Sequence, residues 1–220
     1  MKIATWNING VKARIDSVLV WLKEASPDIA CLQEIKSMTE AFPGSAIEDL
    51  GYNVAVLGQK GFNGVAILSK KPFDEVVEHL PGDETDEQAR FLECAVSTDS
   101  GALRVCCLYL PNGNPVDSGK YPYKLAWMER LTERAQALLK DEECFVLAGD
   151  YNVIPEPEDC YSPSAWIDDA LFLPQTRRAY RTLLNLGLTD AVRACSLKTP
   201  LYTFWDYQRS EEHTSELQSR

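Results

Sequence analysis

The sequence contains no run of about eighteen apolar residues, and its start, MKIATWNING, lacks a basic region followed by a long apolar stretch. The first pattern is typical of a membrane-spanning helix and the second of a secretory signal. We therefore expect neither, and predict a cytoplasmic protein without a membrane partner. The 220 residues, 45% hydrophobic and 25% charged, suffice for one soluble domain with a sizeable core.

Paired cysteines and nucleotide-binding glycine motifs are also absent. The seven cysteines form no CxxC pair, and most lie in apolar, strand-like segments: Cys31, Cys94, Cys106, Cys107 and Cys144. This pattern favours buried free thiols over metal ligands or disulfides. Because there is no GxGxxG and no GxxxxGK(S/T), the sequence gives no support to a nucleotide-cofactor fold.

Basic residues are few, with 22 Lys and Arg against 33 Asp and Glu, so the formal net charge is −11. Phosphate binding usually requires a basic surface, and the total charge therefore argues against a nucleic-acid partner. A protein that recruits a divalent cation can nevertheless gather carboxylates at its centre and place a few arginines locally. Net charge alone does not decide the partner.

Short apolar segments predict strands, and two segments with helical spacing predict helices. The helices run from Ile15 to Leu22, ending before Pro27, and from Leu125 to Leu138. Some strands alternate with helices and others follow one another directly, which favours an α/β fold with a mixed sheet, or two packed sheets, flanked by helices. The predicted strands are residues 2–6, 28–33, 52–57, 64–68, 91–97, 103–110 and 144–149.

Polar residues follow four of these strands. They are Asn7, Glu34, Tyr109 with Asn112, and Asp150 with Asn152. Loops at the ends of strands converge in α/β folds, so we expect these side chains to share one pocket. Carboxylate and amide oxygens suit Mg²⁺ or Mn²⁺, with Glu34 as the best single ligand, and no His/Cys pattern supports zinc.

Each of these residues also has an ordinary structural explanation. Asn7 could cap the helix after Gly10, Glu34 could pair with Lys36, Tyr109 could be a strand aromatic, and Asp150 and Asn152 could be turn residues. Together, however, they match the needs of phosphodiester hydrolysis: charge stabilisation, an activated water and help for the leaving group. Their common position at strand ends favours a functional site.

Five segments, WNING, LQEIK, YLPNG, LAGDYNVIPEPED and YTFWDY, resemble the exonuclease III family of abasic-site endonucleases and exonucleases. The resemblance covers residues 1–208 in the family's motif order. It implies a four-layer α/β sandwich of the endonuclease/exonuclease/phosphatase type. It also implies Mg²⁺-dependent cleavage of DNA 5′ to abasic sites and removal of nucleotides from the 3′ ends of duplex DNA.

The resemblance also implies roles for individual residues. Glu34 is similar to the family's metal ligand, with Asn7 beside it. Asp150 and Asn152 resemble the residues that orient the attacking water and hold the phosphate. Tyr109 resembles a tyrosine that hydrogen-bonds the phosphate and assists the leaving group.

The DNA-binding residues implied by the resemblance lie in several segments. Phe204 and Trp205 match a stretch lining the pocket for the abasic sugar, which a nucleotide without its base enters more easily. The arginines after LFLPQT resemble a DNA-facing loop and helix, and we favour phosphate contact over a merely solvated helix face. The predicted DNA contacts are Arg177, Arg178, Arg181, Asn112, Phe204 and Trp205, with Lys120 and Lys124 as weaker candidates.

The chain departs from the family after Gln208. An RIDH-like segment and a terminal SDH motif are absent, and residues 209–220, RSEEHTSELQSR, look like translated sequencing adapter. We therefore expect residues 1–208 to form a C-terminally incomplete domain without its last strands, followed by a non-native tail.

Without the histidine and aspartate of those motifs, turnover should fall by about 10²–10⁴-fold, and we assign catalysis to neither His79 nor His213. Missing strands would leave an uncovered edge and hence a poorly soluble chain. The alternatives to a monomeric nuclease on duplex DNA are a phosphatase or phosphodiesterase of the same fold, acting on inositol phosphates or lipids, and a catalytically inactive DNA-binding fragment.

Overall fold

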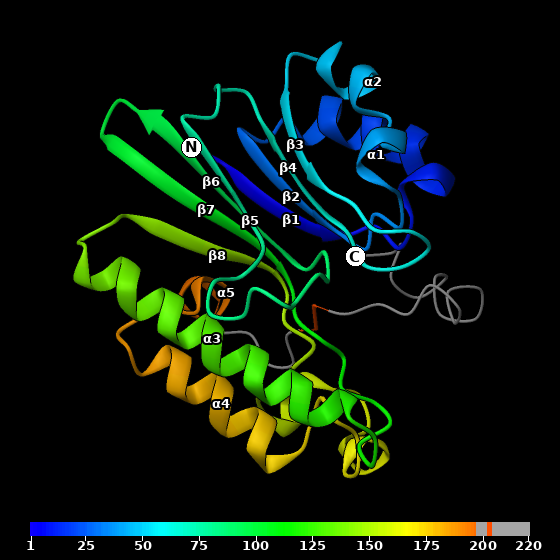
Figure 1. Cartoon of the computed structure of the whole chain (residues 1–220), viewed down its shortest axis with the longest axis vertical. Coiled ribbons are helices and arrows are strands. Elements are labelled where there is room, and N and C mark those ends of the chain that lie inside the picture. Colours follow the sequence, from blue (N-terminus) through cyan, green and yellow to red (C-terminus); the bar gives the residue numbers. More distant parts are fainter. Residues whose placement is uncertain (197–201, 204–220) are drawn as a thin grey trace.

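The computed structural model describes residues 1–196 and 202–203, which fold into two four-stranded sheets packed face to face between helices (Figure 1). The first sheet has the order β1 (Ile3–Asn7), β2 (Ile29–Gln33), β4 (Val65–Ser69) and β3 (Asn53–Leu57). The second has the order β5 (Glu75–Glu78), β6 (Phe91–Thr98), β7 (Gly101–Tyr109) and β8 (Phe145–Asp150).

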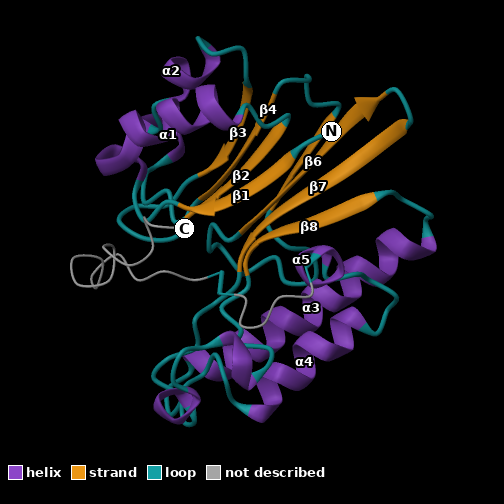
Figure 2. Ribbon diagram, turned by 180° about the vertical axis from the view of Figure 1, so that it is seen from behind, coloured by secondary structure: helices purple, strands orange, loops and turns teal. Residues whose placement is uncertain are grey.

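Helices cover the outer face of each sheet (Figures 1 and 2). The first sheet is covered by α1 (Val11–Ala25) and α2 (Gly44–Glu48), and the second by α3 (Lys120–Lys140) and α4 (Pro174–Leu184). The short helix α5 (Ala191–Cys195) follows α4, and 3₁₀ turns span Thr39–Ala41, Pro157–Asp159 and Pro163–Trp166. The layers therefore run helix, sheet, sheet, helix, which confirms the predicted sandwich.

Three apolar clusters hold these layers together. Cys31, Ile67 and Leu92 belong to the cluster between the sheets, whereas Val18 of α1 packs on the first sheet and Trp127 of α3 on the second. Strands β2 and β4 are buried at every position, as expected for strands covered on both faces. Their continuous apolar sequences are the reason that they could be predicted.

The strand pairing explains why polar strand ends meet. Strand β1 runs parallel to β2 with α1 between them in sequence, and β7 runs parallel to β8 with α3 between them; the other pairs are antiparallel. Strands β1 and β8 also contact each other across the sheets. The carboxyl ends of β1, β2, β7 and β8 therefore lie at one end of the sandwich.

All seven predicted strands are confirmed to within about two residues, and both predicted helices are present. The strand β5 was not predicted, because EVVE is a largely exposed edge strand without an apolar pattern. Cys31, Cys94, Cys106 and Cys107 are buried free thiols, as expected, but the expectation for Cys144 was wrong. It is exposed, since β8 begins one residue later.

Within the described residues, no helix is long and apolar enough to cross a membrane. Phe204, Trp205 and the tail at 209–220 lie outside the described residues, so the expectations for them remain predictions.

Candidate active site

Asn7 connects the two carboxylates of the predicted site. It is the last residue of β1, and its amide nitrogen donates one hydrogen bond to Glu34 Oε1 and one to Asp150 Oδ2, both at 2.8 Å. Its own oxygen accepts from the Asn9 backbone N–H at 3.1 Å. Glu34 and Asp150 are 116 residues apart in sequence yet share one amide group, so the predicted convergence of strand ends is present.

Glu34 follows β2 directly and has a left-handed backbone, with φ of 50°. Burial opposes ionisation of its carboxyl group, but hydrogen bonds from Asn7 and Lys36 outweigh it, and the pKa of Glu34 is lowered. Lys36 Nζ lies 2.9 Å from Glu34 Oε2. Glu34 therefore forms the ordinary ion pair with Lys36 and also lies close to Asp150. Its carboxylate is ionised at neutral pH.

Asp150 is the last residue of β8 and is held from both sides. Its Oδ1 accepts the backbone N–H of Asn152 at 2.9 Å, while Oδ2 accepts from Asn7. Burial raises the pKa of the Asp150 carboxyl, hydrogen bonds from Asn7 and Asn152 oppose that shift, and the negative charge of Glu34 adds to it. A carboxylate with a raised pKa is a suitable proton acceptor.

The glycine before Asp150 lets β8 approach β7 closely. Gly149 has φ of 151°, and a Cβ at this position would lie 1.9 Å from the Leu108 carbonyl oxygen. Asn152 then adopts φ of 46° and donates from Nδ2 to the Leu110 carbonyl at 2.8 Å. The sequence GDYN thus turns the chain sharply while fixing both polar side chains.

Tyr109 ends β7 beside Glu34. Burial, and then the neighbouring Glu34 carboxylate, raise the pKa of its hydroxyl well above the usual range, so Tyr109 stays protonated and can donate a hydrogen. The Arg90 guanidinium lies 4.9 Å from the centre of the Tyr109 ring and donates to the Tyr109 carbonyl at 3.2 Å. Arg90 was not predicted, because nothing in its local sequence indicates this contact.

Asn112 lies in the exposed loop after β7 and reaches the same site. Its Nδ2 donates to Asn152 Oδ1 at 3.4 Å, and its Oδ1 accepts from the backbone and side chain of Asn114. The loop after β7 and the loop after β8 are therefore in direct contact. Asn7, Glu34, Tyr109, Asn112, Asp150 and Asn152 all lie at this end of the sandwich.

Lys124 does not point to solvent, so its prediction as a phosphate contact was wrong. It is completely buried, and its Nζ donates to the carbonyl oxygens of Asn112 at 3.0 Å and Asn152 at 2.6 Å. Burial lowers the pKa of Lys124 to about 7, although Asp169 and Asp150 oppose the shift. Lys120, one turn earlier on α3, is exposed and remains a candidate contact.

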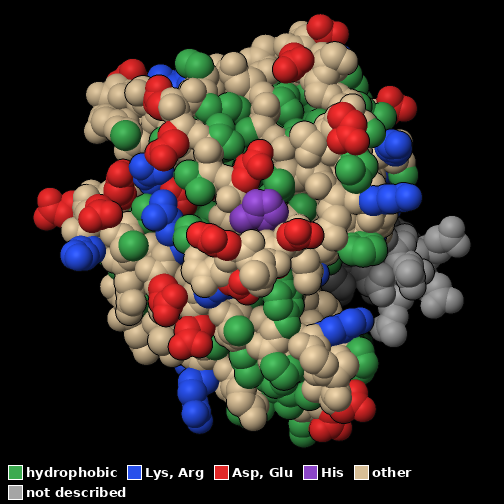
Figure 3. Space-filling model, viewed as in Figure 1, with side chains coloured by type: hydrophobic (Ala, Val, Ile, Leu, Met, Phe, Trp, Pro, Cys, Tyr) green, Lys and Arg blue, Asp and Glu red, His purple; other side chains and the backbone are tan. Residues whose placement is uncertain are grey.

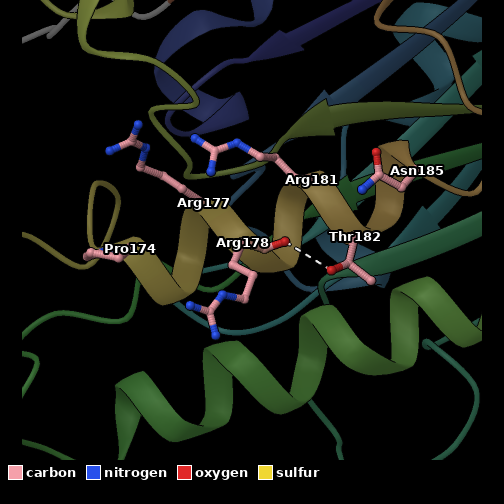
Figure 4. A pocket seen from close by; sticks show the side chains of 6 residues that line it. All are labelled: Pro174, Arg177, Arg178, Arg181, Thr182 and Asn185. Atoms are coloured by element: carbon pink, nitrogen blue, oxygen red, sulfur yellow. Dashed lines mark hydrogen bonds between the residues drawn. The ribbon is translucent and has the colours of Figure 1, made fainter.

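The predicted arginines line an open cavity of about 350 Å³ on α4 (Figure 4). Arg177 and Arg181 project to one side of the helix and Arg178 to the other. Arg177 stacks on the Phe172 ring at 4.9 Å and donates from Nε to the Pro155 carbonyl at 3.0 Å. The remaining lining residues are Pro174, Thr182 and Asn185.

One carboxylate partly neutralises this cavity. Glu156 lies 3.5 Å from the guanidinium of Arg177 and 3.5 Å from that of Arg181. Arg178 and Arg181 are exposed, whereas Arg177 is half-buried. Elsewhere, acidic side chains are spread widely over the surface, as on the face shown in Figure 3, so these arginines form a local cationic site on an acidic protein.

The donor set fits Mg²⁺ or Mn²⁺. Mg²⁺ in enzymes is commonly held by one or two carboxylates together with water and substrate phosphate oxygens. Glu34 offers an ionised carboxylate, and Asp150 lies next to it through Asn7. Within the described part of the chain, no group of three or more His, Cys, Asp and Glu residues is arranged so that it could hold a metal ion.

His79 follows β5 at the same end of the second sheet as Tyr109, because β5 and β7 both pair antiparallel with β6. Its backbone N–H donates to the Phe91 carbonyl at 3.1 Å, and two strands separate β5 from β8. His213, Phe204 and Trp205 lie outside the described residues. The prediction that neither histidine is catalytic, and the predicted sugar pocket, therefore stay predictions.

Comparisons with known proteins agree with this geometry. The family model described as the endonuclease/exonuclease/phosphatase family matches residues 4–213. Exodeoxyribonuclease III of Haemophilus influenzae is 31% identical, over 94% of this chain and 81% of the relative.

Two solved structures are similar over most of the chain. An AP endonuclease from Archaeoglobus fulgidus has a TM-score of 0.89 at 38% identity, covering 98% of this chain and 81% of that one. A 3′ phosphatase from Neisseria, solved with a product DNA hairpin, has a TM-score of 0.89 at 36% identity, covering 96% and 80%.

Proposed function

Because the chain belongs to the endonuclease/exonuclease/phosphatase family, we propose that it is a divalent-metal-dependent DNA-repair nuclease. Its substrates are duplex DNA with abasic sites, cut on the 5′ side, and the 3′ ends of duplex DNA. The observation that carries this proposal is the shared amide of Asn7, which brings Glu34 and Asp150 together. Relatives named as exodeoxyribonuclease III and AP endonuclease support the choice of substrate.

The residues divide the work of hydrolysis. Glu34, aligned by Asn7, would hold Mg²⁺ or Mn²⁺, which would supply positive charge at the scissile phosphate. Asp150 orients the attacking water and accepts its proton as the water oxygen bonds to phosphorus. Asn152 donates to a phosphate oxygen. Asp150 is suited to its task because burial raises its pKa.

Tyr109 acts on the leaving side of the phosphate. Its pKa is raised, so the hydroxyl keeps its proton at neutral pH and can donate it toward the departing 3′ oxygen as the P–O bond breaks. Arg90 holds the ring in place through the stacking contact. The products are a 3′ hydroxyl and a 5′ phosphate.

A second candidate function is removal of phosphate from DNA 3′ ends. The specific support is the likeness to a Neisseria enzyme named as a 3′ phosphatase with a DNA product. The same carboxylates, tyrosine and metal serve both reactions, since only the group on the 3′ oxygen differs. Inositol phosphates are less suitable substrates, because the cationic cavity on α4 offers contacts that a longer anion would use.

The proposal is tested with four substrates: an abasic-site duplex, a recessed 3′ end, a 3′-phosphate duplex and an inositol phosphate. We expect cleavage of the first two in Mg²⁺ or Mn²⁺ and none in excess chelator, with activity restored by added metal. Phosphate release from the inositol phosphate alone would contradict the nuclease. Binding of the abasic duplex in Mg²⁺ without any cutting would indicate an inactive DNA-binding protein.

The cavity on α4 is proposed to bind the phosphate backbone beside the cleavage site. Arg178 and Arg181 are its exposed cations, so replacing both by Ala should remove two phosphate contacts. The slope of log Kd against log salt should become shallower by up to about 1.8, because each neutralised phosphate contributes about 0.9 and Glu156 competes at Arg181. Fluorescence anisotropy of a labelled abasic duplex from low to physiological salt measures this slope.

Lys23→Ala with Lys140→Ala is the matched control, since both lysines are exposed at the ends of other helices. This double variant removes the same total charge without touching the cavity. An equal loss of slope in both double variants would show that only net charge matters and that α4 makes no specific contact.

A further inference from the structure

We infer that Lys124 is a positioning residue, whose buried amine holds the two loops that carry Asn112 and Asn152. This inference rests on the proposed hydrolysis. Lys124 lies on α3, outside the strand ends that supply the reacting groups. Nζ donates to the backbone carbonyls of both asparagines, at 3.0 Å and 2.6 Å. Lys124, on α3, therefore connects the loop after β7 to the loop after β8.

The two loops meet above this amine. Asn112 Nδ2 donates to Asn152 Oδ1 at 3.4 Å, so the side chains touch on the open side while their carbonyls face Lys124. The Asn152 backbone N–H in turn bonds Asp150 Oδ1 at 2.9 Å. A displacement of the Asn152 backbone would consequently move both the phosphate donor and the proton acceptor.

The surroundings are shaped to admit the lysine. A Cβ at Gly113 would lie 2.7 Å from Lys124 Cδ and 3.0 Å from the Ala170 Cβ, so a larger residue there would displace the stem. Gly113 also has φ of 91°, which side-chain-bearing residues rarely adopt. The loop after β7 thus has both the backbone shape and the space that Lys124 requires.

Further contacts fix the loop after β7 to the segment that precedes α4, and that segment to α4. Asn114 Nδ2 donates to Asp169 Oδ2 at 3.0 Å, and Asn114 Oδ1 accepts from the Ala170 N–H at 3.1 Å. Thr176 donates to the Ala170 carbonyl at 2.7 Å and contacts the Tyr121 hydroxyl at 3.1 Å. These contacts hold the loop after β7, whereas Lys124 donates to a backbone carbonyl in each of the two catalytic loops.

The buried amine at this place has opposing effects on stability. Burying a cation is costly, and an apolar side chain of similar volume commonly replaces a buried charge without loss of stability. Methionine at position 124 would fill the same volume and remove the buried charge, but leave two carbonyls without a donor. Lys124→Met therefore has two opposing effects on stability, the removal of a buried charge and the loss of two hydrogen bonds. Its effect on the alignment of the loops is only unfavourable.

The test compares Lys124→Met with Leu138→Ala, which removes a buried side chain near the other end of the same helix. We expect kcat on the abasic duplex to fall by about 10- to 100-fold in Lys124→Met, since misplacement by about 1 Å can cost 10²-fold. The Kd for uncut duplex should stay within about twofold. Leu138→Ala, measured at a temperature where both variants are folded, should keep its kcat.

Hydrogen exchange provides a readout that does not depend on activity. Exchange should accelerate in segments 110–114 and 150–154 of Lys124→Met, but not of Leu138→Ala. A kcat within about twofold of the parent, or equal losses in both variants, would overturn the inference. If the parent itself cuts no DNA, the proposed function fails, and the exchange result alone decides the role of Lys124. Should Lys124→Met not fold, Lys124→Gln is measured against the same criteria.

Discussion

Replacing Glu34 by Gln is expected to lower the turnover of abasic-site cleavage by about 10³-fold. A bound metal ion supplies several kcal/mol of transition-state stabilisation, and each 1.4 kcal/mol corresponds to about tenfold in rate. Gln can still accept the hydrogen bond from Asn7, but it lacks the charge that holds the cation. Single-turnover cleavage of a labelled duplex in saturating Mg²⁺ measures the loss.

Two controls separate loss of metal from loss of structure. Glu24→Gln changes the same group at an exposed position on α1 and should be as active as the parent. Added Mg²⁺ should raise the melting temperature of the parent, because a ligand that binds only the folded state stabilises it. This thermal shift should be lost in Glu34→Gln. A variant that keeps both its thermal shift and its turnover would show that Glu34 is not the metal ligand.

Glu93→Gln is expected to cause the largest loss of stability, about 3–5 kcal/mol, by breaking a buried ion cluster. The Glu93 side chain is completely buried on β6. Arg134 of α3 binds it through Nε at 2.9 Å and Nη2 at 2.5 Å, and Arg104 of β7 through Nη1 at 2.9 Å. Without the charged carboxylate, the two guanidinium groups would lie close together with less negative charge to balance them.

Thermal unfolding should show this effect as a drop in Tm of roughly 6–20 °C, given about 2–4 °C per kcal/mol for chains of this length. Glu75→Gln is the matched comparison, because Glu75 pairs with the same Arg104 at 2.8 Å but is 51% exposed. An exposed pair contributes about 1 kcal/mol or less. Similar Tm losses in the two variants would contradict the assignment of the stability to the buried carboxylate.

Most of the fold could be predicted because burial leaves a pattern in the sequence. Strands β2 and β4 are covered on both faces, and their continuous apolar segments identify them. Helix α1 shows the spacing of a helix that packs on one face. The strand β5 could not be predicted in this way, because an exposed edge needs no apolar residues and its pairing with β6 is set by the backbone.

The site could be predicted only in part, for a related reason. Asn7, Glu34 and Asp150 lie at the carboxyl ends of largely apolar strand segments, so their polarity stands out in the sequence. Parallel pairing brings strand ends together within each sheet, and the contact between β1 and β8 joins the two sheets there. Arg90 and Lys124 have no such signal. Arg90 contacts the Tyr109 ring, 19 positions away, and Lys124 binds carbonyl oxygens of two distant loops. Their roles therefore depend on tertiary contacts, which no local sequence pattern indicates.

The position of Glu156 sets how weakly the α4 cavity should hold intact DNA. Its carboxylate already lies beside Arg177 and Arg181, where it acts as an internal competitor for an incoming phosphate. A single phosphate gains little by displacing it, since one anion merely replaces another. A strand that is also bound in the active site can displace it as an intramolecular step, so undamaged duplex should dissociate quickly while DNA with a site to cut is retained.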